Sequence, residues 1–373
     1  MKSTKIQMML IPTIAAFAFT LPHASPVNAP SLLARSPSLR VADASSLRLA
    51  NAPSMRVAPP ECVDKLDRGL LRACALSWVA VAVPLLVDPS AVALDVFALD
   101  VSGGYGVQQP AAGFLQLAGT LMPLESALLL LLSSGTLNSL ETRARVSASV
   151  TLAGAGVLGT GAAAIATGLT VAQPAAIALV FALSIVSSAT VLRPLLRETS
   201  ARELGELFAA DARELLQGSA ADDGTGGDPL ALFYRSSALA SVVVGGAFML
   251  SPISPLAVYE AELPVTYLAR ADFGVLIALL LSPVQFELYR AAKDGALAAR
   301  VPRLLNLVCA ASICLLDGCG NAQVRMQEVL VAGMDGLPDT FRFEANTTAA
   351  FYTALLVGLV YLVQGVQAKE EAA

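Results

Sequence analysis

Charged side chains are scarce in this chain. Of its 373 residues, 14% are charged and 55% are hydrophobic, and the mean hydropathy is +0.67. Soluble domains carry about 25% charged residues, so the polar surface that a water-soluble body of this size needs is missing. The composition therefore predicts a membrane protein that has the lipid bilayer as its main partner.

Histidine is almost absent as well. His23 is the one histidine, and it lies in a segment that we expect to be removed. The remaining chain has no imidazole for a proton relay, a haem or a zinc site. A net charge of -5 gives no basic surface for nucleic acid. The sequence also contains no Ser-His-Asp set, no paired carboxylates at a water-facing end and no metal-binding cluster. We therefore expect no catalytic activity, no cofactor and no metal.

Residues 1–60 have the composition of a targeting segment. Lys2 and Lys5 precede an apolar run from Met8 to Leu21, and small residues follow it, which is the order found in a signal peptide. The tract after Ala29 is basic and poor in acids. It repeats a Ser-Leu/Met-Arg-Val/Leu unit every eight residues at 38–41, 46–49 and 54–57, as is typical of an organelle transit peptide.

A signal peptide followed by a transit-like tract resembles the two-part presequence of algae whose plastids are reached through the secretory pathway. The segment from Ala16 to Pro22 resembles the cleavage region of these presequences, although Phe19 is followed here by Thr20 and Leu21. The resemblance implies a plastid membrane, either thylakoid or inner envelope. A mitochondrial membrane and a membrane of the secretory pathway remain the alternatives.

Uncharged runs predict about eight transmembrane helices. About 20 largely apolar residues cross the hydrocarbon core of a bilayer as a helix. The run from Val146 to Leu192 is long enough for two spans, with a turn at Gln173-Pro174. Arg303 and Asp317 leave the seventh span short, so Arg303 would have to extend toward the interface. The expected spans are 73–87, 112–134, two within 146–192, 236–259, 273–292, 301–316 and 347–367.

Basic residues predict the orientation of these spans. With eight spans, fifteen Lys and Arg residues fall on one side and three on the other, and the richer side faces the stroma or an equivalent compartment. Both termini are then expected on that side. The three exceptions are Arg270, Arg325 and Arg342; the fifteen are Lys65, Arg68, Arg72, Arg143, Arg145, Arg193, Arg197, Arg202, Arg213, Arg235, Arg290, Lys293, Arg300, Arg303 and Lys369.

The chain also contains an internal repeat. Six residues between Arg72 and Pro89 recur as the same residue 163 positions later. A unit of four spans is even, so the two copies must enter the bilayer in the same direction, as parallel repeats. The expected fold is an all-α polytopic membrane helix bundle made of two parallel four-helix repeats. Its units are a presequence at 1–60, a first repeat at 61–197, a link at 198–230 and a second repeat at 231–373.

The link begins with an amphipathic helix. Ser200 and Glu203 form a capping box, and an apolar stripe follows over 204–216. We expect this helix either to lie along the bilayer surface or to cover the bundle. An acidic, Gly-rich tether is expected over 220–229.

One glycine motif suggests a nucleotide site. Residues 154–159 match G-x-G-x-x-G, but no acidic residue follows before Glu198 to hold a ribose. Small residues also let helices approach closely in lipid, and we interpret the motif as such a contact.

Glu125 is the leading candidate for a functional side chain. It falls near the middle of the second span, where a carboxylate usually faces a partner, a cavity or a pathway. Gln116 lies on the same span, and Gln285 and Glu287 flank Pro283 in the second half. We expect these four residues to form a polar site between the repeats. A neutral, hydrogen-bonded Glu125 or one paired with an arginine is the structural alternative.

Two functions remain open. The first is a carrier or channel for a small solute or ion, with this polar site on its pathway. The second is a non-catalytic subunit of a larger membrane complex, for example a photosynthetic one. A polar, water-accessible cavity between the halves would favour the carrier, whereas a closed core with Gly- and Ala-rich outer faces would favour the subunit.

Overall fold

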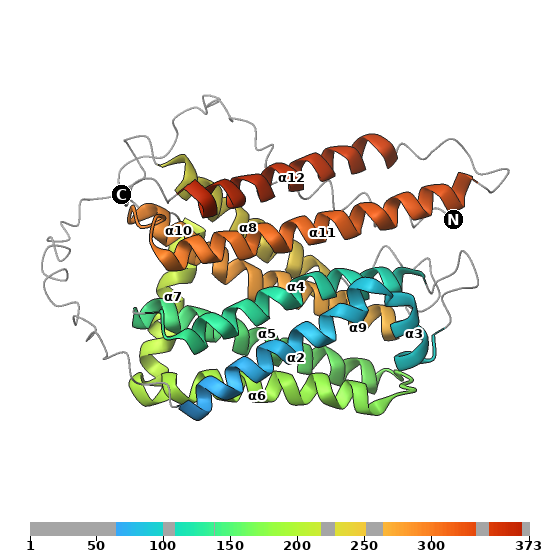
Figure 1. The fold of residues 1–373 in the computed structure, drawn as a ribbon, viewed down its shortest axis with the longest axis horizontal. Helices are drawn as coiled ribbons and strands as arrows, with labels where there is room; N and C mark the ends of the chain where they lie inside the picture. The colour runs from blue at the N-terminus through green and yellow to red at the C-terminus, as the bar shows by residue number, and fades with distance from the viewer. Residues whose placement is uncertain are drawn as a thin grey trace, which may run out of the picture.

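The computed structural model describes residues 65–99, 109–137, 139–217, 228–250, 264–332 and 343–367. Over these residues the chain is an all-α helix bundle, as predicted. The long helices run along one common direction, with α7 across one end and α3 at the other (Figure 1). The predicted presequence and most of the predicted tether lie outside the described residues.

The helices of the first half are α2 Lys65–Val87, α3 Pro89–Phe97, α4 Gln109–Ser134, α5 Leu140–Ala166 and α6 Pro174–Glu198. The link helix is α7 Ala201–Gln217. The second half contains α8 Pro229–Leu250, α9 Pro264–Val275, η3 Leu276–Leu281, α10 Ser282–Lys293, α11 Arg300–Ala332 and α12 Phe343–Gln367.

Seven helical segments in the described part of the chain are long and apolar enough to cross a membrane. They are α2, α4, α5, α6, α8, the continuous segment Pro264–Lys293, and the Arg300–Gly320 part of α11. The eighth predicted span falls on α12, whose shorter apolar stretch is Tyr352–Val366. The protein is therefore a multi-pass membrane protein in contact with a lipid bilayer.

The helix boundaries differ from the predicted spans because charged residues near the ends continue the helices. The sixth span begins at Pro264 rather than Phe273. Arg270 and Asp272 therefore lie inside a helix and not in the loop where the sequence suggested them. Arg270 is 3% exposed and donates to the carbonyl of Phe248, and Asp272 accepts from the Thr160 hydroxyl of α5. These bonds satisfy groups that a position in lipid would leave unpaired.

Pro283 interrupts the regular helix in the Pro264–Lys293 segment. Proline lacks the N–H that a helix needs, and its ring crowds the preceding turn. Immediately before it, η3 is a π-helix, and the Ser282 N–H bonds to Ile277 instead of one residue nearer. The Ser282 hydroxyl also donates to the carbonyl of Ala238 in α8, at 3.0 Å. The irregular turn is thus held against a neighbouring helix.

Helices pack in pairs within each half, and some of them also contact the other half. In the first half α2 packs on α4 and α5 on α6; in the second half α8 packs on α9 and α10, and α11 on α12. Between the halves, α5 contacts α9, η3 and α10, while α11 contacts α4. In the predicted repeat, each of these contacts joins the third span of one half to the second span of the other; the duplication itself stays a prediction. One apolar core extends through both halves, from Trp78 and Leu128 to Leu280 and Tyr361.

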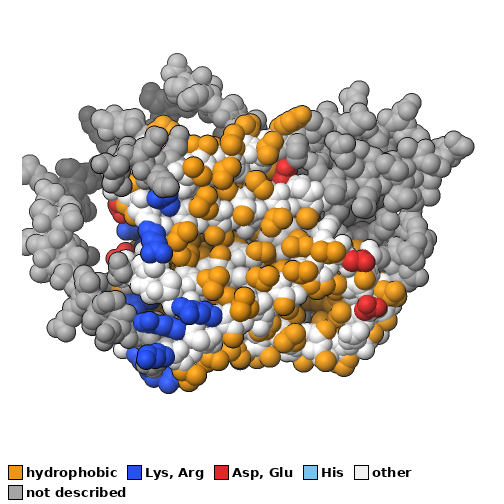
Figure 2. Space-filling model, in the orientation of Figure 1, with side chains coloured by type: hydrophobic (Ala, Val, Ile, Leu, Met, Phe, Trp, Pro, Cys, Tyr) orange, Lys and Arg blue, Asp and Glu red, His pale blue; other side chains and the backbone are white. Residues whose placement is uncertain are grey.

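The two ends of the bundle differ in charge. Lys and Arg gather at the end that carries α7, Asp and Glu side chains are visible at the other end, and apolar side chains cover the face between them (Figure 2). We call the end with α7 the basic end. Its helix α7 begins with the predicted capping box, in which the Glu203 carboxylate accepts from Ser200 N and the Ser200 hydroxyl accepts from Glu203 N, at 2.8 and 3.2 Å. Leu204 packs with Ala144 and Leu195, so α7 covers the bundle.

Glycines in α5 make close helix contacts. A Cβ at Gly154 would lie 2.7 Å from the Ser188 hydroxyl of α6, and one at Gly156 would collide with Val275 of α9. The motif at 154–159 lies within one continuous helix and has no preceding strand. It therefore has the packing environment that we expected and not that of a dinucleotide site.

Candidate functional site

The four predicted site residues do not form one cluster. Gln116 and Glu125 lie on α4, and Gln285 and Glu287 lie on α10. Gln116 Nε2 donates to the Leu86 carbonyl of α2 at 2.9 Å. This bond joins two helices of the first half.

Gln285 makes the corresponding kind of contact in the second half. Its Oε1 accepts from the Ser241 hydroxyl of α8 at 2.7 Å, and the glutamine is 3% exposed. Together with Ser282 it joins α10 to α8. This hydrogen bond of Gln285 lies within the second half.

Glu287 does lie between the halves. Its Oε1 accepts from the Thr142 hydroxyl of α5 at 2.6 Å, and its Oε2 accepts from Arg145 Nη1 at 3.1 Å. The carboxylate is thus satisfied on both oxygens by the first half of the chain. The structure thus places Glu287 at the boundary between the halves.

Arg145 is the centre of a buried ion-pair network. Its guanidinium is 4% exposed. Nε and Nη2 donate to the two carboxylate oxygens of Asp211 in α7, at 2.7 and 3.0 Å. Nη2 also donates to Glu141 at 3.3 Å. Four hydrogen bonds to three carboxylates compensate for the removal of this cation from water.

The network continues toward solvent through α7 and α10. Arg290 and Lys293 of α10 both bind Glu214 of α7, at 3.0 and 2.8 Å. Burial alone would raise the pKa of Glu214, but Lys293 and Arg290 outweigh it and hold that pKa below its usual value. The network therefore connects the first half, the link helix and the second half.

A cleft of about 610 Å³ lies beside this network at the basic end. It opens between the α4–α5 turn and the α10–α11 turn. Arg145, Glu287 and Thr142 contribute to its lining, so the ion pair between the halves faces it. The other lining residues are Thr136, Leu137, Ser139, Glu141, Arg290, Ala291, Asp294, Ala296, Ala299, Arg300, Val301 and Pro302. Both halves thus contribute polar and charged groups to one space.

Glu125 occupies a different place. It is 2% exposed, and its Oε1 has no hydrogen-bond partner. It acts electrostatically on the Cys74 thiol of α2. Trp78, one turn along α2, donates from Nε1 to the Ser187 hydroxyl of α6 at 3.2 Å. Helices of the first half thus lie near Glu125, and Glu125 does not line the cleft.

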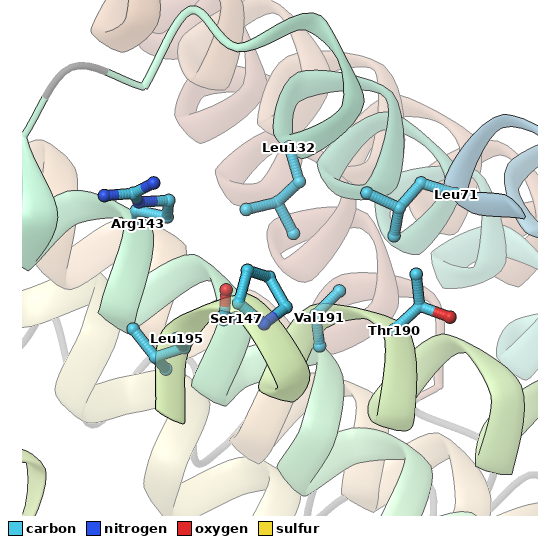
Figure 3. Close-up of a pocket in the computed structure, with 8 residues that line it drawn as sticks. Leu71, Leu132, Arg143, Ser147, Thr190, Val191 and Leu195 are labelled. Carbon is cyan, nitrogen blue, oxygen red and sulfur yellow. The ribbon is translucent and has the colours of Figure 1, made fainter. Parts of the chain in front are cut away.

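A small cavity lies between α2, α4, α5 and α6 near the basic end. Its volume is about 20 Å³, which holds about one water molecule. Leu71, Leu132 and Val191 give it apolar walls, and Ser147 adds a hydroxyl group (Figure 3). Thr190 also lines the cavity, but its hydroxyl points away and donates to the Val186 carbonyl at 2.7 Å. Arg143 lies at its side and pairs with Glu198 at 2.5 Å.

Arg145 and Asp211 are functional candidates that the sequence reasoning missed. Arg145 counted there as one of fifteen basic loop residues. A signal was present, because Arg145 follows Glu141 by one helical turn and adjoins the long uncharged run. Its partners in α7 and α10 are 66 and 142 residues away, and no local pattern identifies them.

Comparison with known proteins adds no relative: no protein-family model, curated protein or solved structure matches this chain.

Proposed function

We propose that the protein is a non-catalytic carrier for a small polar solute, which binds in the cleft beside Arg145 and Glu287. The observation that carries the proposal is the origin of the lining. Charged residues of both signs come from α5 on one side and from α10 and the α10–α11 turn on the other. A site shared by two bundles can change its access when one bundle moves against the other.

The cleft also favours the carrier over a role as a subunit of a larger complex. A pure assembly subunit needs apolar faces for its partners, and lipid alone accounts for the apolar side chains in Figure 2. Such a subunit has no need for a buried, ion-paired arginine beside a space of about 610 Å³. Buried ion pairs cost desolvation energy, so a functional role offers a reason for this one.

Binding and flux measurements on the full-length chain test the carrier. Purified protein in mild detergent is screened by thermal unfolding against amino acids, dicarboxylates and polyamines, and the class that raises the melting temperature is assayed for uptake into liposomes. We expect Glu287→Gln to lower uptake at least about tenfold, because it removes a charge worth about 1.4 kcal/mol or more in binding. Glu206→Gln, on the exposed face of α7, is the matched control.

The same purified protein can also give the result that rejects the carrier. If none of the three classes shifts the melting temperature and the native protein migrates with stoichiometric partners in a larger complex, the subunit function replaces the carrier.

We further propose a plastid membrane, with both termini on the stromal side. The two-part character of residues 1–60 and the fifteen-to-three distribution of basic residues support this location and orientation. A fluorescent protein fused to residues 1–60 should enter the plastid of a host alga. Export of the fusion to the cell surface or delivery to mitochondria would contradict it.

A further inference from the structure

Glu125 lies deep in the bundle without a counter-ion. Nine residues separate it from the last residue of α4, which corresponds to about 14 Å along a helix. No described Lys or Arg forms an ion pair with it, and its Oε1 accepts no hydrogen bond. An ionised carboxylate in such a place is expensive. A neutral, protonated carboxyl group would avoid this cost.

The surroundings of Glu125 are mainly apolar, with one thiol nearby. α4 packs on α2, α3, α5, α9, η3 and α11. Among the described residues of these helices, the thiol of Cys74 in α2 is a titratable group close to Glu125. The Cys74 thiol also interacts with the hydroxyl of Ser187 in α6. The thiol thus lies close to the carboxyl group, and the hydroxyl lies next to the thiol.

The small cavity lies farther along α2, α4 and α6 than Glu125 and its neighbours, toward the basic end. Leu132 lies seven residues after Glu125, which is two turns along the same face of α4. Leu71 lies one turn before Cys74 on α2, and Thr190 lies one turn after Ser187 on α6. All three are wall residues of the cavity. On each helix, the step from the surroundings of Glu125 to the cavity leads toward the basic end.

From these positions we infer that Glu125 is an exchangeable proton-binding site, connected to the basic end through the cavity between α2, α4, α5 and α6. Water that enters from the cavity, past Cys74 and Ser187, takes one proton from the carboxyl group and carries it back toward the basic end. The reverse path returns the proton. This site is separate from the cleft of the proposed carrier.

A hydrophobic carbodiimide tests the inference without any transported solute. Dicyclohexylcarbodiimide attacks protonated carboxyl groups in apolar surroundings. The full-length protein is reconstituted with its basic end outward, the inner pH is fixed, and the labelled residue is mapped by mass spectrometry. We expect labelling at Glu125 that decreases about tenfold for each pH unit outside, above the midpoint of its titration.

Matched variants show which residue carries the label and test the path of the proton. Glu125→Gln should lose the label, whereas Glu287→Gln should keep it, because the ion-paired Glu287 is not the reactive group. Ser147→Ala removes the hydroxyl that faces the cavity, so it should slow the response of labelling to a jump in outer pH.

Three results would overturn the inference: an unlabelled Glu125 in the wild-type protein, labelling that is equal at every outer pH, and labelling that follows the inner pH alone. The proposed carrier could survive each of them, because its own test is solute uptake through the cleft. Loss of uptake with normal, pH-dependent labelling would instead reject the carrier and retain the proton site.

Discussion

Arg145→Gln provides the sharpest test of the energetics of the fold. The substitution removes the cation to which Asp211 and Glu287 are bound and keeps a polar side chain of moderate size. Two of the four lost hydrogen bonds go to Asp211 and one goes to Glu287, whose side chains are 11% and 10% exposed. The fourth goes to Glu141, which is 39% exposed and contributes little.

The expected loss follows from these burials. Hydrogen bonds to charged groups contribute about 1.5–3 kcal/mol each, and their sum is an upper bound because they act as a unit. Glu287 keeps its bond from Thr142, and Asp211 keeps Arg290 at 3.7 Å. Removing one partner of a buried ion pair costs about 3–5 kcal/mol, and we expect Arg145→Gln to lower the free energy of unfolding by that amount.

The assay is unfolding of the full-length protein in mild detergent by added dodecyl sulfate, followed by circular dichroism. Arg202→Gln is the control, because the Arg202–Glu206 pair is exposed and its loss should leave the midpoint unchanged. The double variant with Glu287→Gln should recover part of the loss. A loss of less than about 1 kcal/mol in Arg145→Gln would refute the conclusion that this buried ion-pair network stabilises the fold.

Two further predictions use the same assay. Gly245→Val should destabilise the protein by about 1–3 kcal/mol through overpacking, because its Cβ would lie 2.6 Å from the carbonyl oxygen of Gly274 in α9, whereas Gly246→Val meets nothing within 4 Å; equal effects of the two would contradict this packing. Glu214 has a lowered pKa in the folded protein, so its contribution is complete above the unfolded pKa of about 4.3 and disappears as the pH falls through the lower folded value. Glu214→Gln should therefore flatten the dependence of the unfolding midpoint on pH below about 5, and an unchanged slope would argue against the pairing with Lys293.

The sequence predicted the bundle because hydrocarbon imposes simple requirements. Apolar length identified the spans, and local chemistry identified the capping box of Ser200 and Glu203 and the close-packed glycines of α5. These features depend on residues within a few turns of one another. Helix boundaries were less predictable, because Arg270 and Asp272 continue α9 by bonding to partners on other helices.

The predicted polar site was incomplete for a geometric reason. Its four residues were grouped by depth in the membrane, without regard to direction around each helix. Nine residues separate Gln116 from Glu125, and at about 100° per residue they point to opposite sides of α4. Gln285 and Glu287 differ by about 200° on α10 and therefore meet different neighbours. Which neighbour each one meets depends on tertiary packing, which no pattern in a single chain reveals.

The chain order of the Arg145 network affects biosynthesis. Helix α5 is translated long before α10, so the guanidinium reaches the membrane while the carboxylate of Glu287 is still 142 residues from being made. Asp211 follows after 66 residues and supplies the earlier neutralisation. A nascent protein that ends after α6 would hold an arginine with neither of these acids beside it. Truncated products of this kind should be retained by insertion chaperones or degraded, and maturation of the first bundle should await synthesis of the second.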